Sequence, residues 1–179
     1  ANRGGALAAV RALGSLGHRR IAVITGDPGL VSTEKRLAGY FDGLAALGIE
    51  PQSDLVWQGD FTRQGGYDAV RNHMEQVRRG KVTAIFACND LMAIGGIQAL
   101  KEAGFAIPAQ ISIMGFDGIE VGQFLYPPLT TVQQPVFRLG QEVARVLLAQ
   151  IEDPKKPVQM TLPVQMINET NTIGPAPKG

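Results

Sequence analysis

The chain has 179 residues, of which 45% are hydrophobic and 18% charged, and its formal net charge is +1. This composition is typical of a globular protein with a sizeable core, and the dispersed basic residues give no positive patch for nucleic acid. The single cysteine, Cys88, excludes an internal disulfide, and no apolar run approaches the roughly 18 residues of a membrane span. The chain starts at Ala1 without an initiator methionine or a signal peptide, so we expect a cut inside a longer protein.

Helix-type and strand-type patterns alternate along the chain. Apolar residues at helical spacing predict helices over residues 6–16, 32–48, 67–80, 90–103 and 136–151. Short apolar runs bounded by turn residues predict strands over residues 20–25, 54–58, 83–88, 111–115, 129–132 and 158–167. Because helices of this length separate the strands, we expect a parallel α/β sheet with right-handed crossovers, flanked by helices.

Three of the predicted strands end on polar residues where the chain must turn. Asn89 follows the strand at 83–88, Asp117 follows the strand at 111–115, and Gln134 follows the strand at 129–132. Ligands of open parallel sheets bind outside the carboxyl ends of the strands, so these residues are candidates for one wall of a binding site. None of the three endings supplies a nucleophile with a base or a metal cluster. We therefore expect binding of a polar molecule without catalysis, metal or cofactor.

The predicted helix over residues 90–103 is apolar on nearly every side. A surface helix usually has one apolar stripe, whereas a helix that is apolar all round is buried on two sides. Deep burial within this domain explains the pattern, and so does contact with a second subunit. For the second case we expect a homodimer interface that includes Leu91, Ile94, Gln98, Leu125 and Tyr126.

Five motifs together resemble the lactose-repressor/galactose-repressor family of bacterial transcription regulators. They are Arg-Leu-Ala-Gly-Tyr at 36–40, Gln-Gly-Asp-Phe at 58–61, Asn-Asp-Leu-Met-Ala-Ile-Gly at 89–95, Ile-Met-Gly-Phe-Asp at 113–117, and Tyr-Pro-Pro-Leu-Thr-Thr-Val-Gln-Gln-Pro at 126–135. The resemblance covers residues 14 to 162 and implies a fold like that of type I periplasmic binding proteins. In that fold two α/β subdomains, joined by crossing strands, close over a small effector.

The resemblance also implies a division of the chain. Residues 20–131 would form a complete second subdomain, and residues 1–19 and 132–167 would supply crossovers and parts of a first subdomain that is only partly present. Residues 168–179, rich in Gly and Pro, would be a disordered tail. The DNA-reading helix-turn-helix of the family is missing, so operator binding is implied for the parent protein only. The resemblance further implies a cytoplasmic location and no membrane partner.

The resemblance and the side-chain chemistry together nominate six effector-binding residues. Arg36 offers a fork of donors, although it could instead pair with Glu34, and Asp117 can accept two sugar hydroxyls unless it only caps its loop. The remaining candidates are Phe61 for stacking unless it lies in the core, Asn89 as an amide contact with Asp90 as helix N-cap, Gln134 at the hinge, and Ser32, more plausible as a helix cap than as a contact.

One difference from the purine-responsive members of the family indicates the class of effector. Purine-responsive members of the family carry an additional arginine near the loop where this chain has Leu30, which favours a sugar or sugar derivative. The motif at 58–61 is shared with the purine-responsive members, so a purine effector stays open, as does a periplasmic sugar-binding protein of a transporter. A nucleotide-binding enzyme is disfavoured because the glycine spacing of a phosphate loop is absent. His18 and His73 are interpreted as solvated or capping residues.

Overall fold

The computed structural model describes residues 1–152 and 160–177 and contains one six-stranded sheet with the order β2-β1-β3-β4-β5-β6. The strands are β1 (Ile21–Thr25), β2 (Val56–Gln58), β3 (Ala84–Ala87), β4 (Ser112–Asp117), β5 (Thr131–Gln133) and β6 (Gln165–Ile167). The first five pair in parallel, and β6 runs antiparallel to β5. The predicted α/β fold is confirmed, and the predicted parallel pairing holds for β1 to β5, whereas the antiparallel direction of β6 was not predicted.

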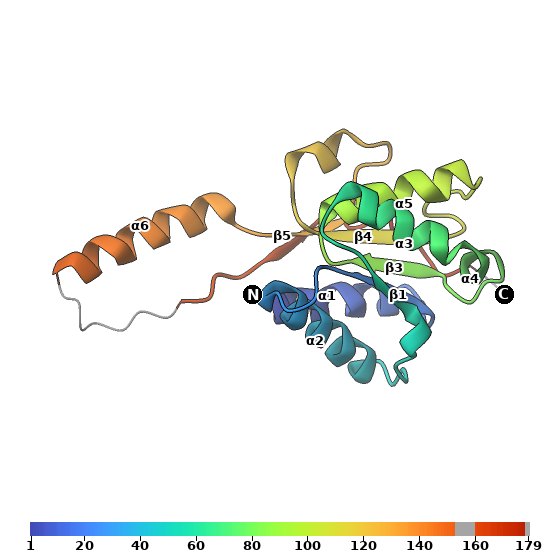
Figure 1. Cartoon of the computed structure of the whole chain (residues 1–179), viewed down its shortest axis with the longest axis horizontal. Helices are drawn as coiled ribbons and strands as arrows, with labels where there is room; N and C mark the ends of the chain where they lie inside the picture. Colours follow the sequence, from blue (N-terminus) through green and yellow to red (C-terminus); the bar gives the residue numbers. More distant parts are fainter. Residues whose placement is uncertain (153–159, 178–179) are drawn as a thin grey trace.

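The helices cover both faces of this sheet. They are α1 (Asn2–Ser15), α2 (Val31–Ala46), α3 (Arg63–Asn72), α4 (Met74–Arg78), α5 (Asp90–Glu102) and α6 (Val136–Glu152), with short 3-10 turns η1 (Ser53–Leu55) and η2 (Glu120–Phe124). Figure 1 shows α1 and α2 below the sheet and α3 and α5 above it, with α4 at the right-hand end of the sheet. Every residue of β1 and β3 is buried, as expected for strands that are covered on both faces.

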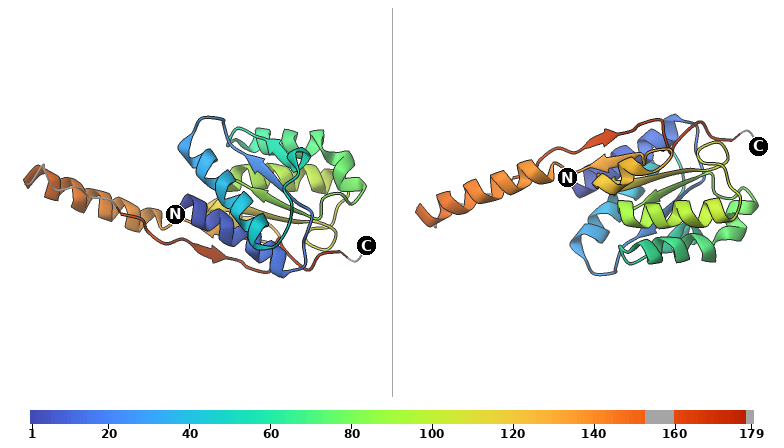
Figure 2. Two further views of the ribbon diagram at one scale, coloured as in Figure 1. Left: turned by 90° about the horizontal axis from the view of Figure 1, so that it is seen from below. Right: turned by 90° about the horizontal axis from the view of Figure 1, so that it is seen from above.

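Helix α6 is the exception to this layered packing. Figures 1 and 2 show it extending away from the sheet beyond β5, beside residues 160–164, which lead into β6. Its apolar side chains stay exposed, among them Phe137, Val143, Leu147, Leu148 and Ile151. The predicted strand over residues 158–167 is shorter in the structure, where β6 covers Gln165–Ile167 and residues 160–164 form no strand. Its first residues, 158 and 159, lie outside the described residues.

The first helix lies where the sequence analysis did not place it. Residues 1–19 were assigned to a first subdomain, but α1 packs against α2 and buries Ala6, Ala9, Val10 and Leu13 completely. Its apolar stripe covers the same sheet that carries residues 20–131. The structural reason is that α2 lies against β1, so without α1 the same side of β3 and β5 would be in contact with water.

The C-terminal segment differs from the expected disordered tail. Thr172, Ile173 and Gly174 are buried, and the Thr172 hydroxyl accepts a hydrogen bond from the Thr130 amide at 2.9 Å. The carbonyl of Gly174 accepts from His18 Nε2 at 2.9 Å, and the Gly174 amide donates to Ser112 Oγ at 3.0 Å. Residues 168–177 are therefore ordered against the amino ends of the central strands. Residues 178 and 179 of the expected tail lie outside the described residues.

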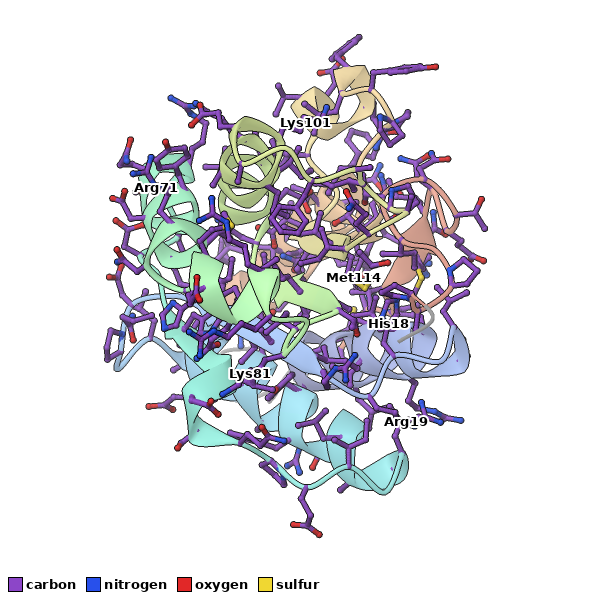
Figure 3. The ribbon with its side chains drawn as sticks, turned by 90° about the vertical axis from the view of Figure 1, so that its right-hand side faces the viewer. His18, Arg19, Arg71, Lys81, Lys101 and Met114 are labelled. Carbon is purple, nitrogen blue, oxygen red and sulfur yellow. The ribbon has the colours of Figure 1, made fainter. Side chains whose placement is uncertain are left out.

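His18 joins these elements and is not the solvated or capping residue that the sequence suggested. It is fully buried, and its ring nitrogens lie 3.0 Å from Thr83 Oγ1 and 3.1 Å from Ser112 Oγ. Figure 3 looks onto this edge of the sheet and shows His18 close to the strand that carries Met114. Burial lowers the pKa of His18, so the ring is neutral at pH 7 and serves as a structural hydrogen-bonding group.

The packing of helix α5 explains why its sequence is apolar on nearly every side. One side packs on β3 and β4, and another packs against α3 at very short range. A Cβ built on Gly95 would lie 1.9 Å from the Arg63 carbonyl oxygen, so only glycine lets the two backbones approach this closely. Burial on two sides within the chain thus explains most of the pattern. Leu91 and Gln98 stay exposed, and Ile94 is half-buried.

Candidate functional site

The carboxyl ends of β4 and β5 and helix α2 bring three of the predicted residues, Asp117, Gln134 and Arg36, together around the Asp117 carboxylate. Arg36 Nη2 donates to Asp117 Oδ1 at 2.8 Å, and Gln134 Nε2 donates to the same oxygen at 2.7 Å. The backbone amide of Gln134 also donates to the backbone carbonyl of Asp117 at 3.0 Å. Among the residues that the structure describes, every side-chain donor to Asp117 reaches Oδ1. The second oxygen, Oδ2, is therefore available to accept hydroxyl groups.

Arg36 is held rigidly from four directions. The side chain is 5% exposed and lies over the Phe116 ring, with its guanidinium carbon 4.0 Å from the ring centroid. Its Nε donates to Asn2 Oδ1 at 2.9 Å, and its Nη1 donates to the Cys88 carbonyl. The predicted alternative, a surface pair with Glu34, is not formed, because the side chain turns inward toward Asp117. A guanidinium fixed in this way can present its remaining N–H groups to a polar ligand without loss of rotamer freedom.

Two site residues adopt backbone conformations that are unusual for their type. Asp117 has φ of 117° and Phe61 has φ of 64°, both in the region that favours glycine. Such conformations cost about 1–3 kcal/mol and persist only where the surrounding structure holds them, often at ligand sites. The Phe61 ring lies directly above Gly26, since a Cβ on Gly26 would be 2.0 Å from Phe61 Cε2. Phe61 is half-buried beside the site. Its ring is therefore neither fully in the core nor fully exposed for stacking on a ligand.

The expected helix cap is wrong, because Asn89 and not Asp90 caps α5. Asn89 is the N-cap of α5, with its Oδ1 accepting from the Met92 amide at 2.9 Å. Its Nδ2 donates to the Phe61 carbonyl at 2.8 Å, which fixes the loop that carries the ring. Asp90, predicted to be the cap, is fully buried and accepts hydrogen bonds from the turn after β4. In this arrangement both polar ends of the Asn89 amide have protein partners.

Ser32 does not cap its helix. Helix α2 starts at Val31, its N-cap residue is Leu30, and no side chain caps it. Ser32 is therefore the second residue of the helix, about one turn before Arg36, and is half-buried. A contact between Ser32 and a ligand stays a prediction.

Sequence reasoning missed two interactions that build the site, one made by Asn2 and one between Asp90 and Thr131. Asn2 orients Arg36 from 34 positions away, and no local pattern could have pointed to it. Asp90 and Thr131 form the second contribution, through a hydrogen bond between Thr131 Oγ1 and Asp90 Oδ1. The sequence places Asp90 beside Asn89 at the end of a strand, which could have indicated a role at the site. The interpretation of Asp90 as a helix N-cap already accounted for that position.

A mostly parallel sheet with a polar cluster at its carboxyl edge is typical of α/β domains that bind small ligands at that edge. Residues 10–169 match the family described as periplasmic binding protein-like domain, and the chain belongs to that family. No helix within residues 1–152 and 160–177 is long and apolar enough to cross a bilayer.

Similar proteins of known name are transcriptional regulators. The regulator CelR of Thermobifida fusca is 36% identical over 172 residues, which cover 96% of this chain and 48% of CelR. The ribose operon repressor of Haemophilus influenzae is 36% identical over 152 residues, covering 85% of this chain and 45% of the repressor. The chain thus spans about half the length of the curated relatives it matches.

Solved structures give the same result. The CelR–cellobiose complex superposes with a TM-score of 0.88 at 35% identity, covering 97% of this chain and 52% of that chain. A LacI family regulator from Enterococcus faecium with bound ribose gives a TM-score of 0.86 at 32% identity, covering 99% and 64%. The resemblance to the lactose-repressor/galactose-repressor family is confirmed.

Proposed function

We propose that this chain is the effector-binding half-site of a cytoplasmic transcriptional regulator, with a sugar or sugar derivative as effector. The observation that carries the proposal is the Asp117 carboxylate, held by Arg36 and Gln134 at a strained φ with one oxygen available. Paired hydroxyls of a sugar match a carboxylate and a guanidinium fork, and Phe61 offers a ring for the apolar face of a pyranose. The cellobiose and ribose bound by two structural relatives support this class of ligand.

Helix α6 fits the same proposal. Its exposed apolar face and its projection beyond β5 suit packing with a first subdomain, whose residues would supply the opposite wall of the cleft. Operator DNA would be read by a part of the parent protein other than this chain. A binding protein of a sugar transporter is disfavoured, because the named relatives are regulators.

A purine-responsive regulator is the second candidate. The repressor PurR of Mannheimia succiniciproducens is 32% identical over 135 residues, which cover 75% of this chain. Leu30, at the N-cap of α2, is 46% exposed and brings an apolar side chain to the loop beside the site. An apolar residue there supplies no donor to a purine ring, which favours the sugar.

The effector class is tested by calorimetry and thermal unfolding of the intact protein with cellobiose, ribose and hypoxanthine. We expect a sugar to raise the unfolding temperature, since a ligand at one hundred times its Kd contributes about 2.7 kcal/mol of stability. The Asp117→Asn variant should lose this response, whereas Asp54→Asn, the same change at an exposed position, should keep it. Stabilisation by hypoxanthine and by neither sugar would establish the purine alternative.

We also propose a homodimer through one apolar surface, formed by α5 and the segment after β4. The segment contributes Tyr126, 91% exposed, Phe124, 78% exposed, and the half-buried Leu125, and α5 contributes the exposed Leu91 and the half-buried Ile94. Lys101 Nζ donates to the Tyr126 carbonyl at 2.9 Å and ties the segment to α5, as Figure 3 shows at the Lys101 label. Gln98, also predicted for the interface, is engaged by Arg63 and Glu102 within the chain and could contact a partner only from its exposed side.

Charge placed on this surface should separate the subunits. We expect Tyr126→Asp to convert the dimer into a monomer at micromolar concentration in sedimentation velocity, because burial of an unpaired carboxylate in an apolar contact is costly. Val31→Asp changes an exposed apolar residue outside this surface and should leave the dimer intact. A Tyr126→Asp protein that sediments as the wild type does would place the contact elsewhere.

A further inference from the structure

Asp90 is a buried carboxyl group that the proposed effector contacts leave without a role. It is the first residue of α5 and is 0% exposed. Its Oδ2 accepts hydrogen bonds from the amides of Gly118 and Ile119, each at 2.8 Å, and its Oδ1 accepts from Thr131 Oγ1 at 2.5 Å. One carboxylate thereby joins α5 to the turn after β4 and to β5.

The surrounding backbone leaves room for this carboxylate. A Cβ built on Gly115 would lie 2.1 Å from Asp90 Oδ1, so a larger residue on β4 would displace the group. Gly118 has φ of +75°, and a Cβ there would meet the Gln133 side chain at 2.5 Å. Both amides that point at Oδ2 therefore belong to a turn whose shape depends on glycine.

This turn begins at Asp117, which has φ of 117°. A conformation of that kind needs restraint from neighbouring groups, and the two amide hydrogen bonds to Asp90 act on the next two residues. We propose that Asp90 is a positioning residue for the effector site, whose carboxylate clamps the turn 117–119 and so holds Asp117 in the orientation that binds the ligand. This inference rests on the proposed function, since it concerns the same site.

The charge of Asp90 is maintained at a cost to the fold. Burial raises the pKa of Asp90 to about 6, and the nearby Asp117 on β4 adds to the rise, while the bonds from Thr131, Ile119 and Gly118 oppose it. Other charged groups near the turn are Arg36, which reaches Asp117 from α2, the exposed Glu120, and Arg138 of α6, which lines one pocket with Gly118. The folded-state pKa of Asp90 lies above its unfolded value. The contribution of this carboxyl group to stability is therefore largest below about pH 4 and is lost as the pH rises through about 6. At pH 7 the fold therefore holds a buried charge at this turn.

The test compares Asp90→Asn with the wild type in the intact protein, using cellobiose and ribose as probes in calorimetry between pH 5 and 7.5. The wild-type affinity should fall as the pH drops through about 6, since protonation weakens the bonds to the two amides. Asp90→Asn should bind about five- to tenfold more weakly at pH 7, as charge-assisted bonds become neutral ones, and its pH dependence should be lost. Its unfolding temperature at pH 7 should equal or exceed that of the wild type.

A second readout needs no ligand. Asp90→Ala should reduce amide-exchange protection at Gly118 and Ile119, while the control Asp54→Asn should not. If neither sugar binds the wild type, the saccharide proposal fails, and protection at these two amides decides the role of Asp90. Unchanged protection in Asp90→Ala, equal affinity of Asp90→Asn and wild type across the pH range, or weaker binding of Asp90→Asn with a lowered unfolding temperature would each overturn the positioning role.

Discussion

Replacement of Arg36 with alanine should lower effector affinity at least about a hundredfold, because two charge-assisted hydrogen bonds to a polar ligand are worth about 3 kcal/mol. The same change should reduce the free energy of unfolding by about 2–3 kcal/mol. It removes the partners of Asn2 and the Cys88 carbonyl, and it leaves Asp117, whose side chain is 27% exposed, without its cation. Calorimetry with the sugar that binds the wild type and urea unfolding measure the two effects.

Two controls separate the local role of Arg36 from the loss of a positive charge. Arg36→Lys keeps the charge but lacks the planar fork, so it should recover part of the stability and little of the affinity. Arg79→Ala breaks a pair with Glu75 in which both side chains are about two-thirds exposed, at 67% and 64%, and should change stability by less than about 0.5 kcal/mol. Near-normal sugar binding by Arg36→Ala would refute the assignment of the site.

The largest effect on stability should come from Gly95→Ala, with a loss of about 3 kcal/mol or more. The new Cβ would lie 1.9 Å from the Arg63 carbonyl oxygen and 2.7 Å from the Tyr67 amide nitrogen. Both are backbone atoms of α3, so no side chain can turn away, and the two helices would have to separate and open voids between them. Guanidinium unfolding followed by the fluorescence of the buried Trp57, the single tryptophan of the chain, measures the loss.

Gly4→Ala is the matched control for this prediction. Gly4 lies in helix α1, and a Cβ there would meet nothing within 4 Å. Because alanine is the better helix former, Gly4→Ala should stabilise the protein by about 0.5–1 kcal/mol. Similar small effects of both substitutions would show that α3 and α5 tolerate a wider separation than their backbone contact suggests.

The fold and the edge that carries the site were predictable from short-range patterns. Apolar runs bounded by Gly, Asn and Asp located the strands, and the intervening helices required parallel pairing. Parallel pairing places all carboxyl ends on one edge, so Asn89, Asp117 and Gln134 had to lie near one another. The hydrogen bond from Gln134 to Asp117 confirms that two of these three strand ends meet.

The assignment of individual roles was harder, because neighbouring residues competed for them. Asn89 and Asp90 are both good N-cap residues, and the sequence alone favoured Asp90. The structure selects Asn89 because the Asp90 carboxylate has partners on β5 and in the turn after β4. Those partners lie 28 and 41 positions away, beyond the reach of any local rule.

The sequence by itself determined the alternation of strands and helices, the parallel direction of β1 to β5 and the residue types at the strand ends, since these depend on backbone propensity and on the spacing of apolar residues. The tertiary structure alone decided that α1 covers this sheet, that residues 172–174 are buried, and that Asn2 orients Arg36. Each of these outcomes depends on contacts between distant parts of the chain, such as the bond between His18 and Gly174 across 156 positions. Such contacts form only where burial and hydrogen bonding together outweigh the entropy of ordering both segments.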